Sequence, residues 1–481
     1  MNADGDGIKV EAPTQLRANS LTLVDSLVLS LANAAPTVGM AGALAALLAA
    51  SGYGSPLAVI IGGVAMLGIA VGYARLNRWD PRAGTTYNWV SIAINPYVGF
   101  LVGWIMLVAY LFTIAGDPFA LGPAVTSLFG VTTPSNVAEF LIGAVAILIV
   151  CVIAVVGIRP TAYLQRILIL IEYAIMLLFV ALAVKAVYFD HIAGSVPASA
   201  SWFTIGGAGG WSGLFAGVVI SVYLYSDWEA NIYTNEETTE RHTNPGRASI
   251  LGVALMIVIF TIFLTGFQGV TSLSSLENAP AGALVVIAHR LLPDPWNSLM
   301  LIAIAEAVLA TLLGNLVASA RILYGMSDPH DGILPIIFSR VHPRFRTPVQ
   351  ATVLFAGLSI VLLGAYLVST SLSNVITYVL SAIGVLFSLF YAVTGLTCAW
   401  HSRAHFGRAR DLLLAGIFPA AAAVFLVVVA IDSLVSNPRT ETVAVLGTIA
   451  AGVPVLLLVR TSGRTGYFRR RGTSGSDAST R

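Results

Sequence analysis

The sequence predicts an all-α polytopic membrane protein with about twelve transmembrane helices. Of its 481 residues, 57% are hydrophobic and only 10% are charged, whereas soluble domains average about 25% charged residues. A helix crosses the ~30 Å hydrocarbon layer with roughly 20 apolar residues. Residues 26–74 and 347–400 contain no Asp, Glu, Lys or Arg, so each run is long enough for two crossings. Composition therefore excludes an ordinary globular protein.

Uncharged apolar runs place the individual helices along the chain. We expect spans at residues 22–50, 55–74, 96–125, 137–157, 161–187, 211–236, 248–272, 297–325, 348–368, 373–397, 411–432 and 442–460. The turn signal Ser-Gly-Tyr-Gly at residues 51–54 separates the first two spans. The first 20 residues are polar and acidic, unlike a signal peptide, so we expect the first helix to remain in the mature protein.

Basic residues are distributed asymmetrically about these spans. All but Lys185, Arg290 and Arg439 of the 25 Lys and Arg residues fall on the side that holds both chain ends. Loops on the cytoplasmic side of a membrane collect Lys and Arg. We therefore expect a multi-pass protein of the plasma (inner) membrane with cytoplasmic N- and C-termini. We interpret Arg321 and the cluster at residues 340–346 as charges that set this orientation.

Two spans carry residues that interrupt a helix near the middle of the membrane. The first contains Pro36, Gly39 and Gly42, and the sixth contains two acids within residues 225–231. Irregular backbone at this depth survives only where protein or a water-filled cavity satisfies it. Since the first and sixth spans open successive groups of five, we expect a five-plus-five inverted repeat with its central site at these breaks. The alternative is that proline and glycine only kink the helices.

Four segments carry a family resemblance. Residues 34–42 are similar to an unwound first helix, and Pro-Arg-Ala-Gly-Thr-Thr-Tyr at residues 81–87 resembles a signature that follows the second. The acidic end of the sixth span with the start of the seventh (235–248) and the segment leaving the eighth (319–335) match in the same order. From residue 21 to about 410, the chain resembles the amino acid–polyamine–organocation (APC) superfamily of permeases.

The resemblance implies the leucine-transporter-like fold with broken helices 1 and 6, and transport by alternating access. On this basis the chain divides into a cytoplasmic N-terminal tail, a ten-helix inverted-repeat transport core, helices 11 and 12, and a basic cytoplasmic tail, at residues 1–20, 21–400, 401–460 and 461–481. We expect secondary active transport of amino acids or related amines, coupled to protons and with a cationic substrate. Import of neutral amino acids and substrate/product exchange are the alternatives.

The resemblance places the substrate carboxylate against the backbone of the unwound first helix. The contacting residues would be Ala35 and, through their N–H groups, Thr37, Val38, Gly39 and Met40. Physical chemistry supports this assignment, because free N–H donors and the positive end of the helix dipole attract an anion.

The sixth span departs from the family pattern at Asp227. Glu229 matches the acidic position of the family, whereas Asp227 stands where glycine is expected. Two carboxylates so close together repel unless a substrate amine or a proton lies between them. Trp228 and Tyr225 offer ring faces to an ammonium group. Tyr378 of the tenth span is a further substrate-binding candidate, although packing explains it equally well.

Ionisable groups inside a membrane are costly and are therefore functional candidates. Glu172 and Glu306 lie near the middle of the fifth and eighth spans. We expect each to carry a proton or to be a protonated carboxyl bonded to a hydroxyl, and we add Glu229 as a proton-coupling residue. Ser319 resembles the hydroxyl of a sodium site, yet the acidic groups favour protons. Asp117 is either functional or solvated near the outer surface.

Other chemistries find no support in the sequence. The seven histidines show no metal-ligand spacing, and the sequence has no P-loop, nucleophile elbow or H-E-x-x-H motif. We expect no enzyme activity, cofactor, metal or nucleic-acid partner; the expected partners are the solute, protons and the lipid bilayer. We interpret Tyr223 and Tyr233 as packing residues.

Overall fold

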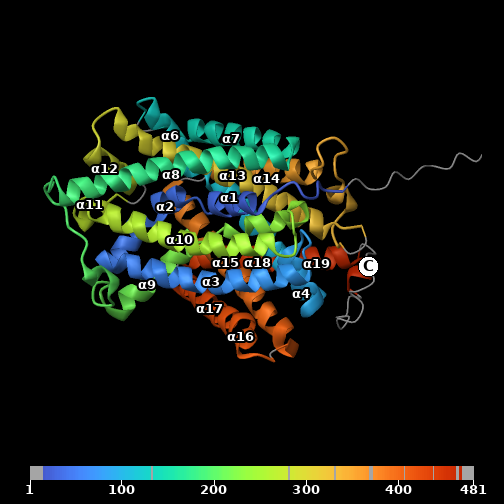
Figure 1. Ribbon diagram of the computed structural model, residues 1–481. Helices are drawn as coiled ribbons and strands as arrows, with labels where there is room; N and C mark the ends of the chain where they lie inside the picture. Colours follow the sequence, from blue (N-terminus) through green and yellow to red (C-terminus); the bar gives the residue numbers. More distant parts are fainter. Residues whose placement is uncertain are drawn as a thin grey trace, which may run out of the picture.

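The computed structural model describes residues 15–131, 134–279, 282–329, 332–367, 372–405, 407–436, 438–461 and 465–468. These residues form helices joined by turns and loops (Figure 1), and their one isolated β-bridge pairs Leu21 with Thr238. The all-α class expected from the composition is confirmed for this part of the chain.

Each predicted span is helical over most of its length. The helices are α1 (Leu23–Ala34), α2 (Pro36–Ser51), α3 (Ser55–Trp79), α4 (Thr85–Ala93), α5 (Pro96–Gly116), α6 (Pro118–Leu128), α7 (Asn136–Val156), α8 (Ile158–Tyr188), α9 (Gly210–Leu224), the 3-10 helix η3 (Trp228–Glu237), α10 (Asn244–Gln268), α11 (Leu273–Glu277), α12 (Ala283–Leu291), α13 (Leu299–Met326), α14 (Val349–Leu367), α15 (Leu372–Ser402), α16 (Ala409–Asp411), α17 (Phe418–Ser436), α18 (Arg439–Ala450), α19 (Gly452–Thr461) and α20 (Thr465–Phe468). Four of these helices, α4, α11, α12 and α20, lie between or after the predicted spans. Within the described residues, nine stretches are long and apolar enough to cross a membrane, and the first of them contains α1, α2 and α3.

Helix packing follows the pattern that two repeats of five spans require. The first span (α1) packs on the seventh (α10), and the sixth span (α9) packs on the second (α3). The third span (α5) packs on the tenth (α15), and the eighth (α13) packs on the fifth (α8). The third span (α6) also packs on the fourth (α7), and the eighth (α13) packs on the ninth (α14). In each comparison, a shift of five spans converts one pair into the other. Equivalent spans also contact each other, as α3 does α10 and α7 does α14. This pairing supports the expected five-plus-five repeat.

Both ends of the described chain lie at one end of the helix bundle, called the terminal end below. The Ser20 N–H donates to the carbonyl of Glu237 (2.7 Å), and the Tyr467 hydroxyl donates to the carbonyl of Pro96 (2.8 Å). In Figure 1, α19 and the segment that leads into α1 lie at this same end. An even number of crossings follows, as the twelve predicted spans require.

Both predicted helix breaks are present. α1 ends at Ala34, Ala35 has a left-handed backbone (φ 33°, ψ 79°), and Pro36 opens α2. Proline cannot donate the hydrogen bond that would continue α1. α9 ends at Leu224, and Asp227 has φ 65° just before η3 begins; aspartate is one of the few residues besides glycine that enter this region. Because α1 packs on η3 and α2 packs on α9, the two breaks lie side by side.

The third predicted span contains a break that the sequence analysis did not predict. Asp117 separates α5 from α6, and Pro118 and Pro123 follow it. The missing N–H groups of two prolines interrupt the ladder of helix hydrogen bonds, although Asp117 itself keeps a helical backbone (φ −51°, ψ −38°).

Arg321, which we interpreted as a charge that sets the orientation, is buried inside the helix bundle. Its guanidinium donates two hydrogen bonds to the Glu237 carboxylate (2.9 and 3.1 Å), and both side chains are fully buried. The pair ties α13 to the last turn of η3 at the terminal end. Charge counting along the sequence did not separate this buried arginine from those in the loops.

Candidate functional site

A small cavity lies where the two helix breaks meet. Its volume is about 30 Å³, which is the room that one or two water molecules occupy. The lining residues come from both breaks and from α5, α13 and α15: Asn33, Ala34, Ala35, Val38, Gly39, Thr113, Asp117, Tyr223, Ser226, Asp227, Thr311 and Ile383. The inner cavity, as we call it, therefore sits at the place that the broken helices predicted.

Two carboxylates give the inner cavity its chemical character. Asp117 and Asp227 both line it, and no Lys, Arg or His among the described residues does. One oxygen of each, Oδ2 of Asp117 and Oδ1 of Asp227, is buried and has no hydrogen-bond partner among the described residues. A buried polar atom without a partner costs free energy, and a charged one costs more. The inner cavity is thus built to accept protons or a cation.

A second cavity, of about 200 Å³, adjoins the inner one and leads away from the terminal end. Val38, Asp117, Tyr223 and Ile383 line both cavities. Most of the other side chains around the second, or outer, cavity are apolar, including those of Phe119, Leu301 and Ile304 on α6 and α13. These shared residues form the boundary between the two cavities.

Tyr223 lines both cavities and also packs against the hydrophobic core, as the sequence analysis expected. A Cβ atom placed on Gly42 would lie 3.7 Å from the Tyr223 hydroxyl, which shows how closely the ring approaches α2.

Glu229 faces a different environment from Asp227. Its Oε1 accepts hydrogen bonds from the hydroxyls of Tyr110 (2.7 Å) and Tyr233 (3.3 Å), and its Oε2 accepts one from Tyr391. The side chain is fully buried and does not line either cavity. Tyr233 is therefore a hydrogen-bond donor as well as a packing residue. The positive φ of Asp227 sends the two carboxylates in different directions although only one residue separates them.

The predicted aromatic contacts lie outside both cavities. Trp228 is fully buried between Tyr73 and Tyr391, with ring centroids 5.2 and 5.7 Å away. The Tyr225 hydroxyl donates to the carbonyl of Val59 (3.0 Å) in the helix core. Met40 is also buried in this core. The side chain of Tyr378 lies outside the described residues.

Glu172 on α8 is hydrogen-bonded to the first helix break. Its Oε1 accepts a hydrogen bond from the N–H of Thr37 (2.9 Å), in the first turn of α2, and its Oε2 has no partner among the described residues. Glu306 lies close enough to act on Glu172 electrostatically, and neither of its oxygens has a partner among those residues. Ser319 donates to the carbonyl of Leu316 within its own helix (3.0 Å). Glu172 and Glu306 are thus brought together, whereas Ser319 and Glu229 are placed elsewhere.

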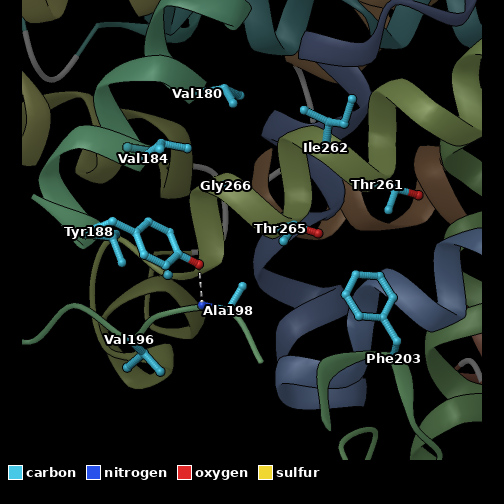
Figure 2. Close-up of a pocket in the computed structure, with 13 residues that line it drawn as sticks. Val180, Val184, Tyr188, Val196, Ala198, Phe203, Thr261, Ile262, Thr265 and Gly266 are labelled. Atoms are coloured by element: carbon cyan, nitrogen blue, oxygen red, sulfur yellow. Dashed lines mark hydrogen bonds between the residues drawn. The ribbon is translucent and has the colours of Figure 1, made fainter. Parts of the chain in front are cut away.

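A larger cavity of about 370 Å³ lies between α8, α10 and residues 196–203 (Figure 2). Its walls are mostly valine, isoleucine, alanine and phenylalanine, and within the described ranges no charged residue lines it. Tyr188 accepts a hydrogen bond from the N–H of Ala198 at its edge (2.9 Å). This cavity has no group that recognises a charged solute, so we place the candidate site at the helix breaks.

Comparison with known proteins identifies the family. The model of the amino acid permease family matches residues 21–453. Among curated relatives, the vacuolar cationic amino acid transporter 4 of Arabidopsis thaliana is 28% identical over 378 residues, which cover 72% of this chain and 58% of that protein. The methylthioribose transporter of Bacillus subtilis is 25% identical over 63% of this chain and 66% of its own length. The low-affinity putrescine importer of Escherichia coli is 23% identical over 66% and 69%.

The alignments thus span less than two thirds of the first two relatives. The family match, in contrast, extends over most of this chain and includes both helix breaks and every residue that lines the inner cavity. The chain belongs to the amino acid permease family.

Proposed function

We propose that this protein is a secondary active transporter that carries a cationic amino acid or amine through the helix breaks by alternating access, with protons as the coupling ion. The observation that supports this most is the inner cavity, where Asp117 and Asp227 each present a buried oxygen without a partner among the described residues. An ammonium group in this cavity would satisfy both oxygens and offset the cost of burying them.

The two ends of the helix bundle differ, because a cavity lies on one side of the breaks and hydrogen bonds close the other. This difference supports alternating access. The outer cavity connects the inner one with the end of the bundle opposite the terminal end. At the terminal end, hydrogen bonds close the bundle: Glu237 binds Arg321 and the N–H of Ser20, and Glu236 accepts from the N–H of Ala83 (2.9 Å). Transport then requires these contacts to open while the outer cavity closes.

Glu172 and Glu306 support the proton as the coupling ion. Both are buried carboxyls in the middle of long helices, and Glu172 is hydrogen-bonded to the first turn of α2. Protonation of Glu172 would weaken its bond to the Thr37 N–H, because a charged acceptor binds an N–H more strongly than a neutral one. The protonation state of Glu172 would in this way affect the hydrogen bonding of the first helix break.

The test is uptake of labelled arginine, putrescine and serine into proteoliposomes that contain the purified chain, in sodium-free buffer with an imposed pH gradient. We expect saturable accumulation of a cationic solute that collapses when a protonophore is added. Serine accumulation alone would favour the neutral amino acid importer. Uptake that needs a solute on the opposite side would favour exchange, and linear ion conductance without accumulation would contradict a transporter.

A further inference from the structure

We infer that the site selects an organic primary amine with an apolar body and no carboxylate, rather than the parent amino acid. This inference rests on the proposed transport function and narrows its substrate class. Two observations carry it: the first turn of α2 is already occupied by Glu172, and the inner cavity holds two carboxylates without a basic side chain in its lining.

The first turn of α2 has few N–H groups left for a substrate carboxylate. Pro36 has no N–H, the N–H of Thr37 donates to Glu172 (2.9 Å), and the N–H of Gly39 donates to the carbonyl of Ala35 (3.1 Å). Within the described residues, only the N–H of Val38 remains free among the first four positions. Glu172 thus occupies, from inside the protein, a position where a substrate carboxylate would bind.

The charges around the first turn of α2 also disfavour a substrate carboxylate. A helix N-terminus carries the equivalent of about half a positive charge, and the carboxylate of Glu172 at the α2 N-terminus offsets it. A substrate carboxylate in the inner cavity would then meet Asp117 and Asp227 and no positive side chain of its lining. A substrate carboxylate is repelled by the carboxylates of Asp117 and Asp227. The inner cavity therefore favours an amine over an amino acid.

The shapes of the two cavities define the rest of the ligand. The inner cavity, about 30 Å³, accepts an ammonium group but not a larger head group. Beyond Tyr223, the outer cavity offers about 200 Å³ lined mainly by apolar side chains, and Asp117 is the only charged residue that the described part of the chain contributes to its lining. A second ammonium group of a diamine finds no further acid there. An apolar or aromatic tail fits this space, which favours a monoamine.

Matched pairs of a primary amine and its parent amino acid test this inference. We would measure binding of tyramine against tyrosine, phenethylamine against phenylalanine, and putrescine as the diamine, by calorimetry on the purified full chain. We expect each monoamine to bind at least ~10-fold more tightly than its parent and than putrescine, as one charge-assisted contact predicts. Equal or tighter binding of the parent amino acids would overturn the inference.

Substitutions at Glu172 separate its charge from its hydrogen bond. Glu172→Ala frees the N–H of Thr37 and removes the negative charge, so the affinity for tyrosine should rise at least several-fold. Glu172→Gln keeps an acceptor for Thr37 and should give a smaller gain. Asp432→Asn, on α17 away from both cavities, removes a carboxylate as a matched control and should change neither ligand. No gain for tyrosine in folded Glu172→Ala, verified by size-exclusion chromatography, would also overturn the inference.

Failure of this inference remains distinguishable from failure of transport itself. If the parent amino acids bind better and are accumulated in proteoliposomes, the chain is a transporter with a different substrate class, and only the inference is wrong. If neither class is bound or accumulated by folded protein, the proposed function fails as well.

Discussion

At the scale of single residues, Asp227 combines a backbone role with a chemical one. Its φ of 65° favours glycine, aspartate or asparagine, and its carboxylate lines the inner cavity. Asp227→Gly therefore changes the charge and the flexibility of the backbone together. Asp227→Asn keeps a side chain that tolerates the same φ and removes only the charge, so it is the cleaner variant.

We expect Asp227→Asn to weaken binding of cationic solutes selectively. A charge-assisted contact contributes about 1.5–3 kcal/mol, which corresponds to about a ten- to hundred-fold loss of affinity. A neutral solute of similar size should lose little. Competition assays with a basic and a neutral solute measure the difference, with Asp227→Gly as a companion variant. An equal loss for both solutes would end the idea of a cation site here.

Glu172 is the residue where coupling should be most sensitive. We expect Glu172→Gln to abolish accumulation of solute against a gradient while exchange at equilibrium continues, because glutamine retains an acceptor for the Thr37 N–H but cannot release a proton. Proteoliposome uptake with and without a pH gradient measures this. Proton-driven accumulation at the level of the unmodified protein would remove Glu172 from the coupling mechanism.

At the scale of helices, the ion pair between η3 and α13 holds the terminal end closed. Glu237 and Arg321 are fully buried, and the Glu237 carbonyl also accepts the N–H of Ser20. This geometry links three segments that are far apart in the sequence. In the proposed transport cycle, a movement of η3 would have to break this ion pair or move α13 with it.

We expect Arg321→Gln to lower the stability of the protein and to open the terminal end. Removing one partner of a buried ion pair costs about 3–5 kcal/mol, because the other charge stays buried without compensation. Thermal unfolding in detergent should show the loss. A second replacement, Glu237→Gln, should restore part of it, since the orphaned charge is then removed. A double variant as unstable as the single one would contradict this account.

At the scale of the whole molecule, the distribution of basic residues predicts the orientation in the membrane. Cysteines introduced at Ser339 and Ser402, near the terminal end, should be shielded from an impermeant thiol reagent in intact cells. A cysteine at Ser199, at the opposite end, should react. The experiment requires removal of Cys151 and Cys398, the free cysteines of the described chain. Labelling of the cysteine at position 339 in intact cells would contradict the predicted orientation or the number of spans.

Some features of the protein follow from its sequence alone, because they depend on local composition. Uncharged runs located the spans, and Pro36 located the first helix break, since a residue without an N–H interrupts a helix wherever it stands. The acidic stretch at residues 225–231 in the middle of the sixth span located the second. Buried carboxyls such as Glu172 were also identifiable, because their cost in a membrane demands a function.

Only the tertiary structure decided which of these groups share one site. Asp117 and Asp227 come from the third and sixth spans, and their meeting in one cavity depends on how α5 and η3 pack around the breaks. The sequence suggested that Asp227 and Glu229 act together, yet the left-handed backbone of Asp227 separates them, and three tyrosines from distant helices surround Glu229. Side-chain direction at a helix break is determined by backbone angles and by packing partners, and neither is encoded in the spacing of residues along the chain.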